Sequence, residues 1–384
     1  MTKALVNARV LLEGRLVDGR VVLIEGDRIA AIVEPSDSRC RGAQAHDLAG
    51  ALLLPGFIDV QVNGGGGVLF NDAPTVESIR AIGEAHRRFG TTAFLPTLIS
   101  DDTATIGRAM EAVRRAIGQK VPGVIGIHIE GPFINPARRG AHDAAKIHAL
   151  DPAGERLLTQ GCGGITLVTL APEATTPEAI RRLASAGVVL SAGHTDATFE
   201  QMRAAFAAGV RGVTHLFNAM SPLASREPGA VGAALLDPDG WCGLIVDGRH
   251  VHRATLQLAL RAKRLERFML VTDAMPCVGA AQTAFVLQGR RIHVRDGVCV
   301  DDEGVLSGSA IDMATAVRNA MDLLGLPLEH AVAMASTHPA SFLGLDGERG
   351  RIAPGCRADL VVADERMNVK QAWIGGEPPA PFFR

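Results

Sequence analysis

The middle of the chain alternates short apolar segments with segments of helical pattern, and this alternation constrains the fold more than any other feature. Each apolar segment has the length of a strand, and helical spacing of apolar residues follows most of them. Eight strands separated by helices predict an α/β fold with a (β/α)8 TIM-like barrel; an open doubly wound sheet is the alternative. We expect strands at 57–62, 92–99, 124–130, 165–170, 188–194, 210–215, 242–247 and 268–273, and helices at 75–89, 104–117, 152–160, 177–186, 197–208 and 253–264.

The two ends of the chain have the alternating pattern of β-strands. Such strands are predicted at 4–12, 20–25, 28–34, 358–363 and 369–374. Neither end has enough strands for a stable sheet by itself, so we expect the termini to meet in one small β-sandwich. The expected division is a sandwich of residues 1–54 and 346–384 and a metal-dependent catalytic barrel of residues 55–345.

Residues 282–306 interrupt the barrel pattern with hairpin-like strands, which we expect to form a flap near the barrel mouth. Helices at 313–324 and 328–335 are predicted to lead back to the sandwich.

The formal net charge of -2, without long charged runs, argues against nucleic acid or a membrane as a partner. The chain has no apolar run long enough to cross a bilayer and no export signal at its start, so a cytoplasmic location is expected. The six scattered cysteines are expected to be buried, reduced thiols.

Four ligand-type side chains come at the ends of four different predicted strands: Glu130, His194, His215 and Asp273. Singly, each histidine is better explained as a hydrogen-bonded structural residue, and the aspartate as a turn cap. In a barrel, however, the carboxyl ends of the strands converge on one face, where catalytic groups collect. Two imidazoles and one carboxylate match the ligands of a catalytic zinc site. Asp273 is then expected beside the metal, as general base and general acid.

These residues and their neighbours resemble the N-acetylglucosamine-6-phosphate deacetylases of the amidohydrolase superfamily. The resemblance covers essentially the whole chain, and its last segment, 355–360, is similar to the closing segment of the superfamily. It rests on the segments 55–64 (PGFIDVQVNG), 128–133 (HIEGPF), 191–194 (SAGH), 214–220 (THLFNAM), 226–229 (REPG), 247–250 (DGRH), 272–274 (TDA) and 306–309 (LSGS).

The resemblance implies hydrolysis of the acetamide of N-acetyl-D-glucosamine 6-phosphate, with Glu130, His194 and His215 as metal ligands. Asp273 would be the acid/base and His142 would polarise the acetamide carbonyl. It also implies a homodimer, with Arg226 and His250 reaching the neighbouring active site. The implied substrate-binding residues are Ala141, His142, Asn218, Ala219, Arg226, Asp247, Gly248, Arg249, His250, Leu306, Ser307 and Gly308.

The chain departs from the superfamily after the first barrel strand. Many members carry His-x-His there, whereas this chain has Gln61-Val62-Asn63, so one divalent ion per subunit is expected. Zinc is the first choice, and iron, cobalt or manganese suits the same nitrogen and oxygen ligands. Two alternatives to the main function stay open: a deacetylase of N-acetylgalactosamine 6-phosphate or another N-acyl amine, and a non-catalytic sugar-phosphate sensor. For Arg226, the alternative to a phosphate contact is a surface ion pair with Glu227.

Overall fold

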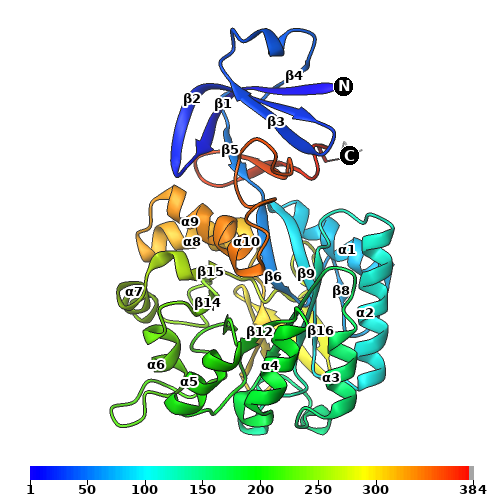
Figure 1. Ribbon diagram of the computed structural model, residues 1–384, viewed down its shortest axis with the longest axis vertical. Helices are drawn as coiled ribbons and strands as arrows, with labels where there is room; N and C mark the ends of the chain where they lie inside the picture. The colour runs from blue at the N-terminus through cyan, green and yellow to red at the C-terminus, as the bar shows by residue number, and fades with distance from the viewer. Residues whose placement is uncertain (380–384) are drawn as a thin grey trace.

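The computed structural model, in which residues 1–379 are described, has an eight-stranded parallel sheet at its centre, surrounded by helices (Figure 1). The strands follow the order β15-β14-β13-β12-β11-β10-β9-β6, so strands adjacent along the chain are adjacent in the sheet, as the predicted barrel requires. They are β6 Phe57–Val62, β9 Thr91–Ile99, β10 Gly126–Glu130, β11 Ile165–Leu170, β12 Val189–Ala192, β13 Gly212–Val213, β14 Trp241–Leu244 and β15 Phe268–Leu270.

A helix follows each of these strands and buries its apolar face against the barrel. Helix α5 shows how the sequence starts such a helix: the Thr198 hydroxyl accepts a hydrogen bond from the Gln201 N–H, and the Gln201 side-chain oxygen accepts one from the Thr198 N–H. The helices are α1 Val76–Arg87, α2 Thr103–Gly118, α3 Pro152–Thr159, α4 Pro177–Ser185, α5 Phe199–Ala208, α6 Gly229–Leu236, α7 Arg253–Ala262 and α8 Met313–Leu324.

The barrel closes between its first and last strands through side chains and loops. No strand ladder joins β6 to β15 in the described chain; instead, the Asp273 N–H donates to the Gln61 carbonyl at 2.9 Å. In the preceding residue, the Thr272 hydroxyl donates to Asp59 Oδ2 in β6 at 2.5 Å. Burial raises the pKa of Asp59 to about 7. These bonds fix the backbone of Asp273 against the first strand.

The two termini form one sheet beyond the end of the barrel, as Figure 1 shows. Strands β5 and β20 pair antiparallel, with Leu53 opposite Val362, which confirms the expected union of the termini. The division of the chain at residues 54 and 346 stays a prediction. The strands of this sheet are β1 Thr2–Leu12, β2 Arg15–Glu25, β3 Arg28–Val33, β4 Gln44–Asp47, β5 Leu52–Pro55, β20 Leu360–Ala363 and β21 Val369–Trp373.

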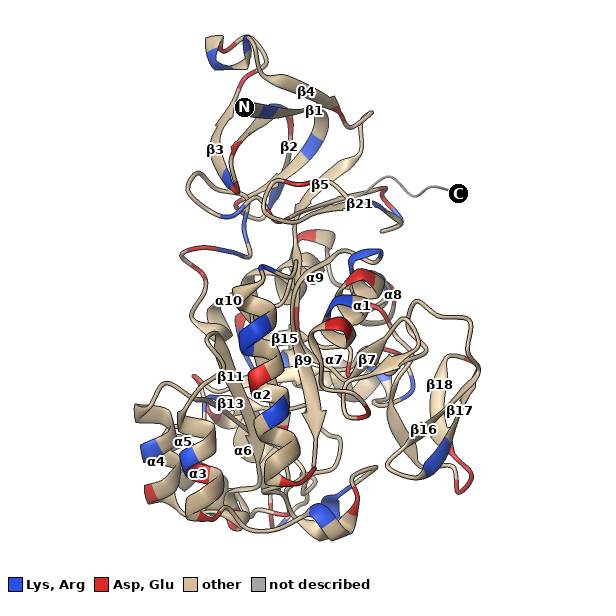
Figure 2. Cartoon of the chain, turned by 90° about the vertical axis from the view of Figure 1, so that its right-hand side faces the viewer, with Lys and Arg blue, Asp and Glu red and all other residues tan. Residues whose placement is uncertain are grey.

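The flap is a separate four-stranded antiparallel sheet beside the barrel (Figure 2). It begins within the expected segment 282–306 and ends three residues beyond it, at Ser309. The strands are β16 Ala284–Leu287, β17 Arg290–Arg295, β18 Val298–Asp301 and β19 Leu306–Ser309. A further small hairpin, β7 Gly64–Gly65 with β8 Val68–Leu69, follows the first barrel strand.

Several elements differ from the sequence prediction. Helix α6 was not expected, because its residues Gly229–Ala234 are all buried and leave no polar face to mark a helical period. Helix α10 (Thr337–Leu343), which follows the expected α9 (Leu328–Ala335), was not expected either. The strands expected to run to His194, His215 and Asp273 end two, two and three residues earlier.

Across residues 1–379, none of the helices combines the length and the apolar character that crossing a bilayer needs. Five of the six cysteines are buried and Cys40 is half-buried. Acidic and basic residues are interspersed along the chain, as the red and blue segments of Figure 2 show.

Candidate active site

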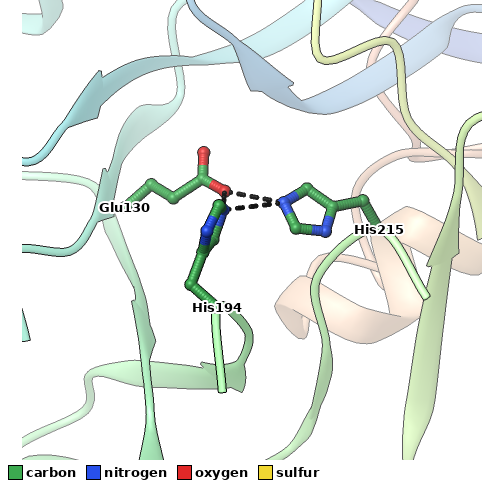
Figure 3. Close-up of side chains that lie close together, drawn as sticks. All are labelled: Glu130, His194 and His215. Carbon is green, nitrogen blue, oxygen red and sulfur yellow. Dashed lines mark hydrogen bonds and ion pairs between the residues drawn. The ribbon is translucent and has the colours of Figure 1, made fainter. Parts of the chain in front are cut away.

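Three ligand atoms meet at the mouth of the barrel, one from the last residue of β10 and two from residues that follow β12 and β13 (Figure 3). Glu130 Oε1 lies 3.1 Å from His194 Nε2 and 2.9 Å from His215 Nε2, and the two nitrogens are 3.1 Å apart. All three side chains are buried. One carboxylate oxygen and two imidazole nitrogens within 4.8 Å of one another are able to hold a metal ion.

The backbone leaves the strands in an unusual conformation at these positions. His194, His215 and Asp273 have φ angles of 48°, 32° and 52°, in the left-handed region that non-glycine residues seldom adopt. These φ values depart from the extended conformation of a strand, and the barrel strands end two or three residues before these positions. Such conformations cluster at functional sites because surrounding structure must hold them in place.

The second nitrogen of His194 determines its tautomer. Nδ1 lies 2.8 Å from the carbonyl of Arg138, and since a carbonyl only accepts, Nδ1 carries the proton. Nε2 therefore presents a lone pair to the cluster, as a metal ligand must. Arg138 is in turn held by an ion pair with Asp196 at 2.8 Å. The Nδ1 of His215 is buried and has no hydrogen-bond partner in the described chain.

The surroundings shift the pKa values of the two carboxyl groups of the site in opposite directions. Burial by itself would raise the pKa of Glu130, but the neighbouring rings of His194 and His215 outweigh it and hold the pKa well below the usual range. Burial and the neighbouring charge of Glu130 raise the pKa of Asp273 to about 6. One carboxylate is thus a fixed anion, while the other can take up a proton near neutral pH.

Gln61, in β6, and Asn63, directly after it, bring side-chain amides to the two carboxylates. Gln61 Nε2 donates to Glu130 Oε2 at 3.0 Å and to Asp273 Oδ1 at 3.2 Å. Asn63 Nδ2 donates to the same Asp273 oxygen at 2.6 Å. Because these N–H groups face the carboxylates, the amides orient both acids, and within the described chain they bond Asp273 through Oδ1 alone.

His142 stands beside the cluster, with its ring 4.4 Å from the His194 ring. The Ser100 N–H donates to His142 Nδ1 at 3.3 Å and the Ser100 hydroxyl lies 2.7 Å from it, so Nδ1 is an acceptor. Burial lowers the pKa of His142 well below the usual range, so the ring is neutral and carries its proton on Nε2. Gly131 makes this arrangement possible, because a Cβ there would overlap the Ser100 hydroxyl.

A pocket of about 360 Å³ opens over these groups, within the size range of small-molecule sites. It brings together the three ligand residues, Asp273 and His142. Of the predicted substrate-binding residues, Ala141, Asn218, Ala219, His250, Leu306 and Gly308 line it, whereas Arg226, Asp247, Gly248, Arg249 and Ser307 do not.

Asp247 and His250 form one unit at the edge of the pocket. Asp247 Oδ2 lies 2.6 Å from His250 Nδ1, and Asp247 Oδ1 accepts from the His250 N–H at 2.9 Å. Asp247 therefore orients His250. His250 lines the pocket of its own chain, and its expected reach into a neighbouring subunit stays a prediction.

Arg226 is exposed and lies outside the pocket. The alternative of an ion pair with Glu227 is not found among the described residues. Glu227 Oε1 instead accepts from the N–H groups of Phe199 and Gly229. The guanidinium of Arg226 is thus not paired with the carboxylate of Glu227, its neighbour in the chain.

Sequence reasoning missed Ser100 and Arg138, which orient the two histidines, and saw Gln61 and Asn63 only as a departure from His-x-His. A serine after an apolar strand and an arginine in a loop carry no distinctive signal by themselves. The Arg138 contact is made by a backbone carbonyl, which no residue type predicts.

The barrel with a carboxylate–imidazole cluster and an adjacent acid at its mouth defines a metal-dependent hydrolase of the amidohydrolase type. The model of the amidohydrolase family matches residues 52–378. An N-acetylgalactosamine-6-phosphate deacetylase of Shewanella sp. (strain ANA-3) is 44% identical over 97% of this chain and 94% of its own length.

Two solved structures are also similar over nearly the full length. The N-acetylglucosamine-6-phosphate deacetylase of Pasteurella multocida has a TM-score of 0.95 at 35% identity, covering 99% of this chain and 100% of its own. A mutant of the Mycobacterium smegmatis enzyme in complex with N-acetyl-D-glucosamine 6-phosphate has a TM-score of 0.90 at 34% identity, covering 98% and 99%. The chain therefore belongs to the amidohydrolase family and, within it, to the group of acetylated amino-sugar 6-phosphate deacetylases.

The cluster generates a prediction about metal content. Purified protein should hold about one equivalent of divalent metal, and His194→Ala or His215→Ala should reduce this at least about tenfold, because each removes a ligand of the buried set. Metal analysis by mass spectrometry measures it. His148→Ala, an exposed histidine outside the cluster, is the control and should keep full occupancy. Full occupancy in the two ligand variants would show that the ion binds elsewhere.

Proposed function

We propose that the protein hydrolyses the acetamide of N-acetyl-D-glucosamine 6-phosphate, releasing acetate and D-glucosamine 6-phosphate, in the breakdown or recycling of amino sugars. The observation that carries this is the meeting of Glu130, His194 and His215 in one pocket with Asp273 and His142. The names of the relatives support the substrate. Intact ligands and a raised aspartate pKa also argue against a non-catalytic sensor, which has no need for a water-activating set.

Glu130, His194 and His215 would hold one divalent ion, with zinc as the first choice and iron, cobalt or manganese as alternatives. Such an ion, when bound, supplies Lewis acidity toward water and the acetyl group. The unprotonated Nε2 of His194 and the ionised Glu130 fit this role. One ion is favoured over two because the amides of Gln61 and Asn63 turn N–H groups toward the site.

Asp273 would move the proton. Its Oδ1 is occupied by the amides of Gln61 and Asn63, so Oδ2 takes the proton from the attacking water and passes it to the sugar nitrogen as the amide bond breaks. The neutral ring of His142 would donate its Nε2–H to the acetyl oxygen, where negative charge develops. Leu306 and Gly308 line the acetamide end, beside the backbone of Ala141.

The phosphate end of the sugar would be held by neutral donors and a guanidinium. Asn218, Ala219 and His250 line the pocket. Arg226, exposed and unpaired with Glu227, would reach the phosphate in the site of a second subunit, which makes the enzyme a homodimer.

We place the enzyme in the cytoplasm, where its buried free thiols stay reduced. Asp247 contacts His250 directly. We also assign Gly248, Arg249 and Ser307 to the sugar-binding site, behind the residues that line the pocket.

A second candidate substrate is N-acetyl-D-galactosamine 6-phosphate, favoured by the name of the 44% identical relative. The two sugars differ only at the 4-hydroxyl. Acetate release from each epimer, measured as kcat/KM on the same preparation, decides between them. A gluco-to-galacto ratio above about ten supports the main proposal, since this equals about 1.4 kcal/mol of transition-state discrimination. The opposite ratio would assign the galacto substrate, and no acetate from either would reject both.

Replacing the proton carrier tests the mechanism. Asp273→Asn should lower kcat for acetate release at least about a hundredfold, because an amide cannot accept the proton from water. Metal content should stay near normal, since Glu130, His194 and His215 are unchanged. Asp239→Asn, an exposed carboxylate, is the control and should leave kcat unaltered. Near-normal turnover of Asp273→Asn would refute the assigned role.

Removing the guanidinium tests phosphate recognition. Arg226→Ala should raise KM for the phosphorylated sugar about tenfold or more and leave kcat within about threefold, because a charge-assisted contact far from the acetamide is lost. Activity on unphosphorylated N-acetylglucosamine should not change. The exposed Arg203→Ala serves as the control. Equal losses on both sugars would argue against a phosphate contact.

A further inference from the structure

The turn between β16 and β17 reaches from the flap to the loop that carries His142. Gln288 and Gly289 form this turn, with φ angles of 47° and 82°, the pair of positive values typical of a tight hairpin. The Gln288 side chain bridges two backbone groups: its Nε2 donates to the Ser100 carbonyl at 2.6 Å, and its Oε1 accepts from the Asp143 N–H at 2.5 Å. Ser100 contacts the ring of His142, and Asp143 follows His142 in the chain.

Arg290, on the next strand, holds the other side of the same loop. Its guanidinium donates to the Ala141 carbonyl at 2.6 Å and lies 3.4 Å from the carboxylate of Asp301 within the flap. The residues before and after His142 are thus both bonded to the flap. Ser100, whose N–H and hydroxyl set the tautomer of the His142 ring, is bonded to the flap as well.

Apolar contacts of the residue before the turn hold the turn in place. Leu287, which precedes Gln288, is buried and packs in a cluster of its own with residues from the barrel loops and the flap. Leu287 also lines the pocket. The buried members of this cluster are Leu69, Ile99, Met275, Cys277, Leu287, Ile292 and Cys299.

We propose that Gln288, supported by Arg290, is a positioning residue for the reaction: it holds the loop 141–143 and Ser100 so that the Nε2–H of His142 points at the acetyl oxygen. Gln288 itself does not touch the substrate and acts through His142. This inference rests on the proposed role of His142 in the deacetylation. It assigns the flap a part in the chemistry beyond covering the pocket.

The test is a double-mutant cycle between Gln288 and His142. Gln288→Met keeps the length of the side chain and removes both hydrogen bonds, and Arg291→Ala, an exposed neighbour in the same hairpin, is the control. In the otherwise unchanged enzyme, Gln288→Met should lower kcat about tenfold or more, because misplacing a catalytic group costs rate. In a His142→Ala background the same change should lower kcat less than about twofold, because the residue it acts through is gone.

Equal losses in both backgrounds, or an equal loss in Arg291→Ala, would overturn the proposal. A second measurement does not depend on activity: amide hydrogen exchange over residues 141–143 should quicken in Gln288→Met and not in Arg291→Ala. Unchanged exchange would show that the turn does not hold the loop. If wild-type protein releases no acetate, the proposed function fails, whereas the exchange experiment still reports on the contact. Gln288→Glu, which loses only the donor to Ser100, repeats the cycle if Gln288→Met does not fold.

Discussion

The structure depends on keeping one buried carboxylate ionised. Glu130 ends β10 inside the barrel mouth, where an isolated charge would be costly; the imidazoles of His194 and His215 lie at one of its oxygens, and the amide of Gln61 donates to the other. Without these partners the carboxyl would take up a proton and lose its value as a ligand. The requirement links strands β6, β10, β12 and β13 at a single point.

The partners reach Glu130 only because the chain turns sharply where the strands end. The left-handed backbone at His194, His215 and Asp273 costs of the order of 1–3 kcal/mol at each residue. Hydrogen bonds on either side hold these turns; the Asp273 N–H, for example, is bonded to Gln61 across the closing seam of the barrel. The rigid barrel thus stabilises a conformation that the local sequence does not favour.

A second set of contacts orients the groups around the cluster. Ser100 sets the proton position of His142, Arg138 that of His194, and the two amides after β6 occupy Asp273 Oδ1. Each is a hydrogen bond between segments far apart in the chain. The amides of Gln61 and Asn63 align the two acids.

The sequence by itself predicted the barrel, the joining of the termini, the flap and the four residues at the mouth, because these leave local patterns: apolar periodicity, and a ligand-type residue after an apolar run. It missed α6, whose uniformly apolar surface has no period, and it extended three strands into residues with positive φ. Which tautomer His194 and His142 adopt, which oxygen of Asp273 the two amides bond, and the contact of Gln288 with the His142 loop were decided only by the tertiary structure. The physical reason is that hydrogen bonds between distant segments depend on where the folded barrel places backbone groups, and backbone groups are the same for every residue type.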